Sequence, residues 1–219
     1  GGRFLRERAI RFEQEGGSVK AVVTRSGSQA ADVVVLAAGA WGKSLAAQLG
    51  ARVPLEAERG YHAMLPNSGV TLEVPVIYGD FHCSLTPMEQ GLRVGGTVEF
   101  AGVDAPPNYE RADTMIRLAQ RLLPGVDVSD AERWMGPRPS LPDSLPVLGR
   151  APQARNAFMA FGHGMLGLTQ GGISGRVIAD LVAGRQPPLD LQPYRAGRFN
   201  LPPWATVPTG GEQQEPVSV

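Results

Sequence analysis

The chain has 219 residues, of which 42% are hydrophobic, and its 21 basic residues balance 21 acidic ones to a formal net charge of zero. This length suits one large domain or two small ones, and the balanced charge gives no general case for nucleic acid or an anionic membrane as a partner. No run of about 18 apolar residues is present, which excludes a membrane-spanning segment of the usual kind, and the single cysteine, Cys83, excludes an internal disulfide framework and fits a reducing compartment.

The first fifty residues predict a sheet with one short helix. Residues 3–24 alternate loosely between apolar and charged side chains, and Gly16-Gly17 predicts a hairpin turn between two strands. Ala31–Leu36 carries the β-branched run Val33–Val35, a pattern found in a parallel strand that is buried on both faces. Small residues and an aromatic follow in Ala37–Trp41, and Lys43–Leu49 predicts a short helix that Gly50 would end.

The middle of the chain has a different pattern. Four short segments punctuated by proline and glycine predict an antiparallel sheet: Val53–Pro66, Val74–Tyr78, Ser84–Pro87 and Leu92–Phe100. Tyr109–Leu123 carries apolar residues at helical spacing and predicts one amphipathic helix, which Pro124-Gly125 would end. We predict a rigid loop at Trp134–Pro139, because turn residues dominate it.

The segment Phe158–Asp180 predicts a short buried strand, a glycine-rich turn and a helix that starts near Thr169 and ends at Gly184. This order brings backbone close to a ligand at a helix N-terminus, where free N–H groups favour negative charge. Gly171 and Gly175 would lie on one helical face and allow it to approach another backbone or a flat ligand. The alternative is a loop followed by a tightly packed helix.

Arg138 is the side chain that most strongly indicates a binding site. It is a cation among prolines and apolar neighbours, where a guanidinium is costly unless it pairs with an anion. A bidentate grip on a carboxylate suits guanidinium geometry. A structural salt bridge, for instance to Asp143, is the alternative. We predict no metal site, because His62 and His82 lack partner ligands at useful spacing.

Three blocks together resemble the FAD-dependent D-amino acid oxidase superfamily, and most of all the bacterial D-amino acid dehydrogenases and the glycine or sarcosine oxidases. The blocks are ADVVVLAAGAW at 31–41, Gly136-Pro137-Arg138-Pro139 with the Pro142–Gly149 segment, and GHGMLGLTQGG at 162–172. The resemblance covers roughly residues 1–199. It implies an α/β or α+β fold, with part of a Rossmann-like FAD/NAD(P)-binding domain and an inserted antiparallel-sheet substrate domain.

The implied domain boundaries follow this order. Residues 1–50 and 136–186 would belong to the FAD-binding domain, 51–135 to the substrate-binding insertion, and 187–219 to a C-terminal extension that is partly disordered. Members of the family open with a strand–helix unit whose G-x-G-x-x-G turn holds the FAD diphosphate. We assign no such motif here, taking Gly162, Gly164 and Gly167 to have a different spacing. The family therefore implies an N-terminal FAD-binding portion or a partner subunit.

The resemblance also implies roles for individual residues. The FAD-proximal set is Ala9, Ala38, Gly39, Trp41, Gly162, His163, Gly164, Met165, Leu166, Gly167, Leu168 and Thr169. Arg138 would hold the substrate carboxylate, and Tyr61 and Ser84 would line the substrate pocket. His163 is the one candidate for a catalytic role, with a hydrogen-bonded turn histidine as the alternative. Simple packing is the alternative for Ala38, Gly39 and Trp41. Packing or a surface position is the alternative for Tyr61 and Ser84.

The implied activity is FAD-dependent oxidative deamination of a D-amino acid, or of a related small amino or imino acid, by hydride transfer to flavin. The family implies a cytoplasmic enzyme or one peripheral at the inner membrane. Two alternatives stay open. The chain is a catalytically incomplete fragment or subunit that needs a partner chain to bind FAD, or it is a flavoprotein of the same fold that acts on a 2-hydroxy acid.

Overall fold

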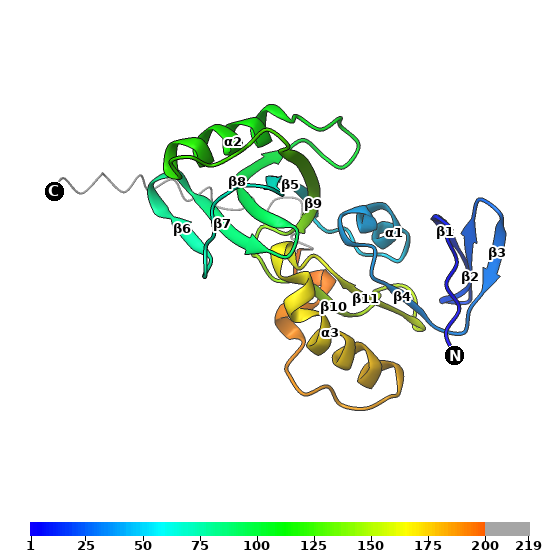
Figure 1. The fold of residues 1–219 in the computed structure, drawn as a ribbon. Coiled ribbons are helices and arrows are strands. Elements are labelled where there is room, and N and C mark those ends of the chain that lie inside the picture. Colours follow the sequence, from blue (N-terminus) through cyan, green and yellow to red (C-terminus); the bar gives the residue numbers. More distant parts are fainter. Residues whose placement is uncertain (200–219) are drawn as a thin grey trace, which may run out of the picture.

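The computed structural model describes residues 1–199 and contains three sheets (Figure 1). A small N-terminal sheet lies at one end of the molecule and a five-stranded sheet at the other. A mixed three-stranded sheet lies between them, with helix α3 on one side of it.

The N-terminal sheet is an antiparallel meander of β1 (Ala9–Glu15), β2 (Ser18–Thr24) and β3 (Gly27–Ala30). Gly16 and Gly17 join β1 to β2 with φ angles of 56° and 71°. Two successive positive φ values match the two-residue turn that suits the twist of a hairpin. The predicted turn is confirmed.

The mixed sheet has the order β10 (Val147–Arg150), β11 (Ala157–Phe161), β4 (Val34–Leu36), with β11 and β4 parallel. The prediction that the β4 run is buried on both faces was wrong. Val34 and Leu36 are buried, but Val33 and Val35 are 42% and 44% exposed. Within residues 1–199 this second face is only partly covered, because β4 is an edge strand.

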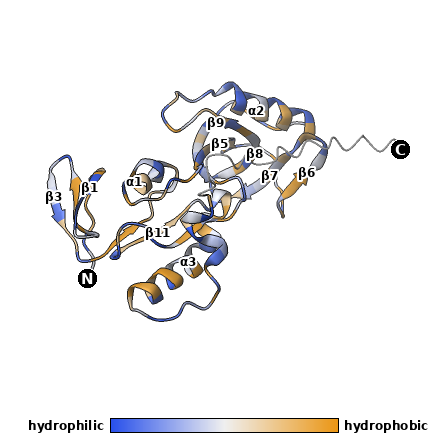
Figure 2. Ribbon diagram, turned by 180° about the vertical axis from the view of Figure 1, so that it is seen from behind, coloured by the Kyte–Doolittle hydropathy of each residue, from blue (hydrophilic) through white to orange (hydrophobic). Residues whose placement is uncertain are grey.

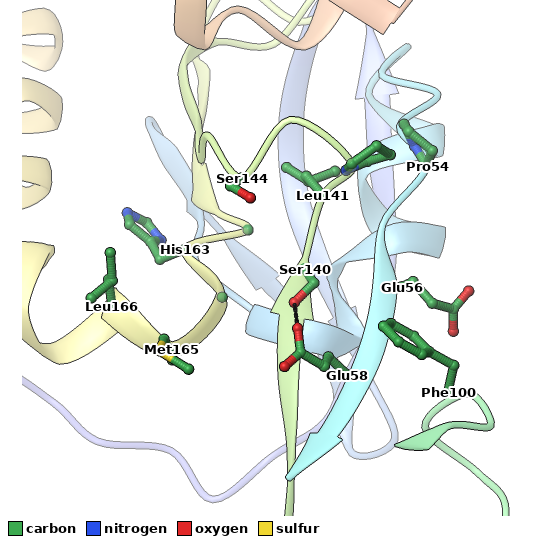
Figure 3. A pocket seen from close by; sticks show the side chains of 13 residues that line it. Pro54, Glu56, Glu58, Phe100, Ser140, Leu141, Ser144, His163, Met165 and Leu166 are labelled. Atoms are coloured by element: carbon green, nitrogen blue, oxygen red, sulfur yellow. Dashed lines mark hydrogen bonds between the residues drawn. The ribbon is translucent and has the colours of Figure 1, made fainter. Parts of the chain in front are cut away.

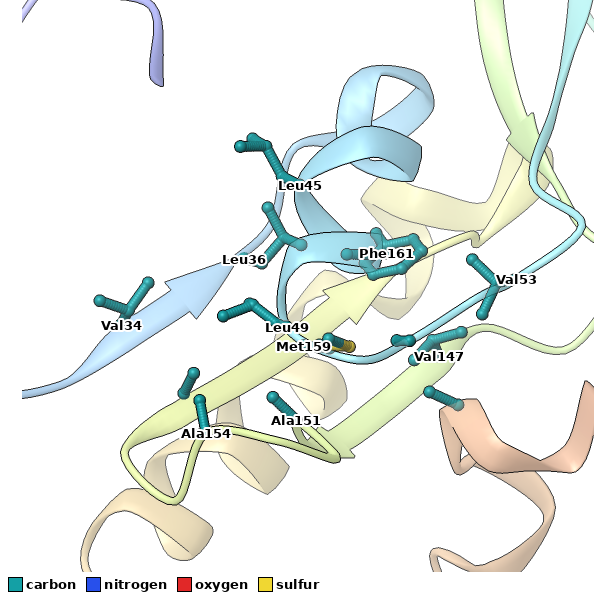
Figure 4. Close-up of a cluster of buried hydrophobic side chains, with 14 of the residues drawn as sticks. Val34, Leu36, Leu45, Leu49, Val53, Val147, Ala151, Ala154, Met159 and Phe161 are labelled. Carbon is teal, nitrogen blue, oxygen red and sulfur yellow. The ribbon is translucent and has the colours of Figure 1, made fainter. Parts of the chain in front are cut away.

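The first hydrophobic core lies between the mixed sheet and helix α1 (Gly42–Gln48), as Figure 4 shows. Phe161, at the end of β11, is 1% exposed, and its ring lies 3.7 Å from the position that a Cβ would take at Gly42. Gly50, with a φ of 84°, follows α1, so the predicted short helix and its end are confirmed.

The five-stranded sheet is antiparallel and has the order β6-β7-β8-β5-β9. Its strands are β5 (Glu56–Leu65), β6 (Val76–Tyr78), β7 (Cys83–Met88), β8 (Gly91–Phe100) and β9 (Glu132–Ser140). Helix α2 (Glu110–Leu122) packs on one face and buries its apolar side, including Met115 and Ile116, against this sheet. The predicted antiparallel sheet and amphipathic helix are confirmed.

The prediction of a loop at Trp134–Pro139 was wrong, because these residues lie in strand β9. Proline cannot donate a hydrogen bond to a neighbouring strand, so it is tolerated in a sheet mainly at an edge. β9 pairs only with β5 among the described strands, and Pro137 and Pro139 are therefore compatible with it. The boundary that we predicted between residues 135 and 136 falls inside this strand.

Helix α3 (Gly167–Val182) follows the short 3₁₀ turn Gly164–Leu166. Gly184 has a φ of 70°, and it ends the helix as predicted. One side of α3 is buried through Ser174, Val177, Ile178 and Asp180, and its apolar and polar patches alternate in Figure 2. A Cβ at Gly171 or Gly175 would meet no atom within 4 Å, so this small-residue face is open within the described chain.

Two further 3₁₀ turns, Gln192–Tyr194 and Ala196–Phe199, follow α3. Arg198 is tied to Asp143 through a 2.7 Å ion pair. Another 3₁₀ turn, Gly79–Phe81, joins β6 to β7. Disorder was predicted for part of the 187–219 extension, namely Thr209–Val219 with its almost complete lack of apolar residues, and this stretch lies outside the described residues.

Candidate functional site

A cavity of about 840 Å³ lies where the five-stranded sheet meets the loop that opens α3. The sheet supplies its charged and aromatic walls, and the loop supplies glycines and exposed apolar side chains. Its lining residues are Glu58, His82, Ser84, Arg93, Gly95, Gly96, Val98, Trp134, Gly136, Pro137, Arg138, Pro139, Gly164, Met165, Gly167 and Leu168.

Three glycines on adjacent strands form the floor beneath the planar side chains of this site. Gly60 on β5 is directly opposite Gly136 on β9, and Gly95 lies on β8. A Cβ at Gly60 would lie 2.5 Å from the guanidinium of Arg138, and one at Gly136 would run into the ring of Trp134. The absence of β-carbons therefore lets flat side chains lie across the sheet.

Arg138 is held by a carboxylate of the neighbouring strand. It is the direct cross-strand partner of Glu58, and its Nη1 donates to Glu58 Oε1 at 2.9 Å. The other oxygen, Oε2, accepts a hydrogen bond from Ser140 Oγ at 3.0 Å. Both side chains of the ion pair are about one-quarter exposed, so the pair is partly shielded but still faces the cavity.

Arg138 does not form the salt bridge with Asp143 that the sequence suggested as an alternative. Asp143 pairs with Arg198, whose Nε lies 2.7 Å from Asp143 Oδ2. Arg138 pairs with Glu58 because both lie at the same level of neighbouring strands, whereas Asp143 comes after β9 has ended.

Arg93 is a second arginine of the cavity that sequence reasoning missed. It lies on β8, half-buried, with its guanidinium over Gly95. Burial, and then the nearby charge of Arg138, lower its pKa from the ordinary value for arginine. The sequence signal that could have identified Arg93 is the alternation of side chains along a strand, which places Arg93 and Gly95 on one face of β8.

His62 lies beneath this charged surface and stacks on Trp134, with ring centroids 4.7 Å apart and an angle of 27° between the planes. Its Nδ1 is buried and has no hydrogen-bond partner among the described residues. Burial, followed by the positive charge of Arg93, lowers the pKa of His62 to about 4. The imidazole is therefore neutral near pH 7.

This neutral histidine predicts a loss of stability on mild acidification. In the unfolded chain His62 takes up a proton near its ordinary pKa of ~6.5, whereas in the folded chain it does so only near 4. Its contribution is therefore complete above the unfolded value and declines as the pH falls toward the folded one. We expect the urea midpoint to fall between pH 7.5 and pH 4.5, and to fall less in His62→Phe. Equal pH dependence in the two proteins would contradict this assignment.

The loop between β11 and α3 corrects our statement about glycine spacing. Gly162, Gly164 and Gly167 do match G-x-G-x-x-G, and they lie between a strand and a helix. In a dinucleotide-binding unit the third glycine permits close helix packing, but a Cβ at Gly167 would meet only His163 Cβ, at 3.8 Å. The tight position is Gly162, where a Cβ would lie 2.5 Å from Leu141. No strand follows α3 within residues 1–199 to complete a crossover.

A second cavity, of about 490 Å³, adjoins the first and shares Glu58, Gly164 and Met165 with it. Figure 3 shows the Ser140–Glu58 hydrogen bond, with Met165 on one side of it and Phe100 on the other. The 162–168 loop therefore borders both spaces. Gly162 and Gly164 have φ angles of 87° and 56°, which side chains with a β-carbon rarely adopt.

His163 lines the second cavity rather than the first. Its Nε2 lies 2.9 Å from Ser174 Oγ on α3, and burial lowers the pKa of its imidazole. This contact ties the loop to the second turn of the helix. The geometry thus matches the turn-histidine alternative more closely than a catalytic role.

Two predicted pocket residues occupy different environments. Ser84 lines the arginine cavity, and its hydroxyl donates to the carbonyl of Gly95 at 3.2 Å. Tyr61 is elsewhere than predicted: it is 1% exposed and is hydrogen bonded to Glu99 and to the amide of Asn108. Side chains alternate along β5, so Tyr61 points away from the face that carries Glu58.

The remaining predicted cofactor residues lie outside both cavities. Ala38 precedes a 3₁₀ turn formed by Gly39–Trp41, Trp41 is 53% exposed, and Ala9 begins β1. Thr169 is exposed in the first turn of α3.

No helix among residues 1–199 is long and apolar enough to cross a membrane, and no three His, Cys, Asp or Glu side chains there are grouped as metal ligands.

Comparison with known proteins agrees with the resemblance noted in the sequence. A D-amino-acid oxidase from Bradyrhizobium diazoefficiens is 38% identical over 203 residues, covering 91% of this chain and 48% of that protein. A D-amino acid dehydrogenase from Rhizobium rhizogenes is 35% identical over 202 residues, covering 91% and 48%. The chain spans about half the length of these curated relatives.

The fold is similar to that of glycine oxidase from Geobacillus kaustophilus, with a TM-score of 0.77 and 28% identity over 88% of this chain and 52% of that one. The family model for FAD-dependent oxidoreductases matches residues 1–181. The chain therefore belongs to the FAD-dependent oxidoreductase family.

Proposed function

We propose that the chain forms the substrate-binding and flavin-edge part of an enzyme that oxidises the amino group of a D-amino acid or a related small amino or imino acid. One observation carries the proposal. A single cavity is lined both by Arg138 and by the start of α3. The guanidinium of Arg138 can bind a carboxylate, and a helix N-terminus favours the negative charge at the edge of a reduced flavin ring.

The residues around this loop fit a flavin ring. Met165, Leu166 and Leu168 are 70%, 45% and 98% exposed, so three apolar side chains lie uncovered beside a helix N-terminus. The first-turn N–H groups of a helix have no partners within it. We assign Gly162–Thr169 to the ring edge, where these groups would stabilise the negative charge that develops on reduction. When bound, FAD supplies the acceptor for the substrate hydride.

Arg138 orients the substrate. Its Nη1 is fixed by Glu58, its side chain lines the cavity, and its remaining N–H groups can hold a carboxylate. Fixing the carboxylate and the neutral amine orients the α-carbon for hydride transfer. Such orientation accounts for much of the rate acceleration in reactions of this kind. No dedicated acid–base pair is required, and His163 is engaged with Ser174.

The adenosine and diphosphate of FAD are assigned to Ala9, Ala38, Gly39 and Trp41 together with a portion outside this chain. The exposure of Val33, Val35, Trp41 and Ile173, each 42–53% exposed, supports this second element of the proposal. The faces of a parallel strand are ordinarily covered. A partner subunit or an N-terminal portion that pairs with β4 would cover them.

A visible spectrum and anaerobic reduction test the proposal. The purified chain is mixed with FAD and then with D-alanine, L-alanine or D-lactate. A bound flavin that D-alanine bleaches supports amino acid oxidation, whereas bleaching by D-lactate alone favours a 2-hydroxy acid. If the chain binds no flavin until a separate N-terminal portion or partner subunit is supplied, the incomplete-subunit alternative is correct. A flavin that no amino acid reduces in the assembled protein would refute the proposed activity.

A further inference from the structure

Arg93 differs from Arg138 in having no partner. Among residues 1–199, no carboxylate lies within 4.0 Å of its guanidinium and no hydrogen bond from it is formed. Its Nη1 and Nη2 instead lie 3.3 Å and 3.4 Å from the position of a Cβ on Gly95. The planar group therefore lies flat over the sheet at the wall of the cavity.

The charges of the cavity do not cancel. Two arginines and one glutamate line it, and Glu58 is already bonded to Arg138 and Ser140. One positive charge is left, and it belongs to Arg93. A half-buried guanidinium beside a second one is costly unless an anion joins it, and guanidinium geometry matches the two oxygens of a carboxylate.

We infer that Arg93 is a second carboxylate-binding residue, which holds the ligand carboxylate jointly with Arg138. Glu58 positions Arg138, while Arg93 brings the uncompensated charge. The site therefore takes one carboxylate, and the substrate class is a monocarboxylic amino acid with an uncharged side chain. An acidic side chain would bring a second negative charge with no second cation to receive it. The assignment of the ligand as an amino acid rests on the proposed function.

Binding of acetate to the chain tests the anion site without flavin. The Nε–H signals of arginine are followed by NMR while acetate is added at constant ionic strength against chloride. We expect Arg93→Leu to weaken acetate binding roughly 10- to 100-fold, since hydrogen bonds to a charged group are lost. Arg93→Lys should restore part of it. Arg117→Leu, which removes an exposed arginine of α2, is the matched control. Acetate affinity within twofold of the parent in Arg93→Leu would overturn the inference.

Kinetics of the assembled flavoprotein separate this inference from the proposed function. With D-alanine, Arg93→Leu should raise KM roughly 10-fold or more and change kcat less, and the parent should have a higher KM for D-glutamate than for D-alanine. An unchanged KM in Arg93→Leu would overturn the role of Arg93 even if D-alanine is oxidised. If no amino acid reduces the flavin, the proposed function fails, and Arg93-dependent acetate binding still supports the anion site.

Discussion

Replacing Arg138 by leucine is expected to raise the KM for an amino acid substrate by roughly 100-fold or more in the assembled flavoprotein. Two hydrogen bonds from a charged donor are lost, each contributing about 1.5–3 kcal/mol. The change also leaves the Glu58 carboxylate with Ser140 as its only hydrogen-bond partner within residues 1–199, and this carboxylate then repels that of the substrate. The effect should therefore exceed that of removing Arg93. Steady-state kinetics with D-alanine measure it.

A double variant separates the two causes. In Glu58→Gln with Arg138→Leu, the repulsion is gone while the lost hydrogen bonds remain, so KM should recover by part of the 100-fold. Arg138→Lys should keep the charge but lose the bidentate geometry and give an intermediate value. A KM for Arg138→Leu within threefold of the parent would show that this arginine does not bind the carboxylate.

Replacing Phe161 by alanine is expected to lower the free energy of unfolding by about 3–5 kcal/mol, the usual cost of removing a buried aromatic ring. Phe161 is 1% exposed, packs against Gly42 and lies in the core between α1 and the mixed sheet (Figure 4). It also directly precedes Gly162, so a cavity there loosens the loop that borders both pockets. Urea unfolding followed by circular dichroism measures the change.

Leu168→Ala is the matched control, because this leucine lies in the same region but is 98% exposed. Its removal should alter the unfolding free energy of the chain by no more than about 0.5 kcal/mol, as for most surface changes. In the presence of FAD it should weaken cofactor binding, since Leu168 belongs to the proposed ring surface. Equal destabilisation by the two substitutions would show that the core is not where the structure places it.

Local pattern was sufficient for elements whose signals lie within a few residues. The Gly16-Gly17 hairpin, the helix before Pro124 and the glycine end of α3 were all predicted, because turn chemistry and helical period are local. Strand β9 was missed for a non-local reason. Its two prolines argue against a strand, and only the place of β9 at the sheet edge makes them acceptable.

The candidate site was predictable in its residue types but not in its pairings. Arg138 stands out in the sequence because of its neighbours, yet its ionic partner Glu58 is set by the register of β5 against β9. Arg93 reaches the same face only through the pairing of β5 with β8, which shifts between Tyr61 and His62. Sequence alone does not give a register that includes such an irregularity.

The three glycines of the sheet floor set a limit on how this fold can be made more robust. Glycine within a strand destabilises it by about 0.5–1 kcal/mol relative to alanine, so Gly60, Gly95 and Gly136 are natural targets for thermostabilising substitutions. At Gly60 and Gly136, however, an added methyl group would displace Arg138 or Trp134. Variants selected only for heat resistance would therefore tend to lose ligand affinity, and selection for both properties should leave these positions unchanged.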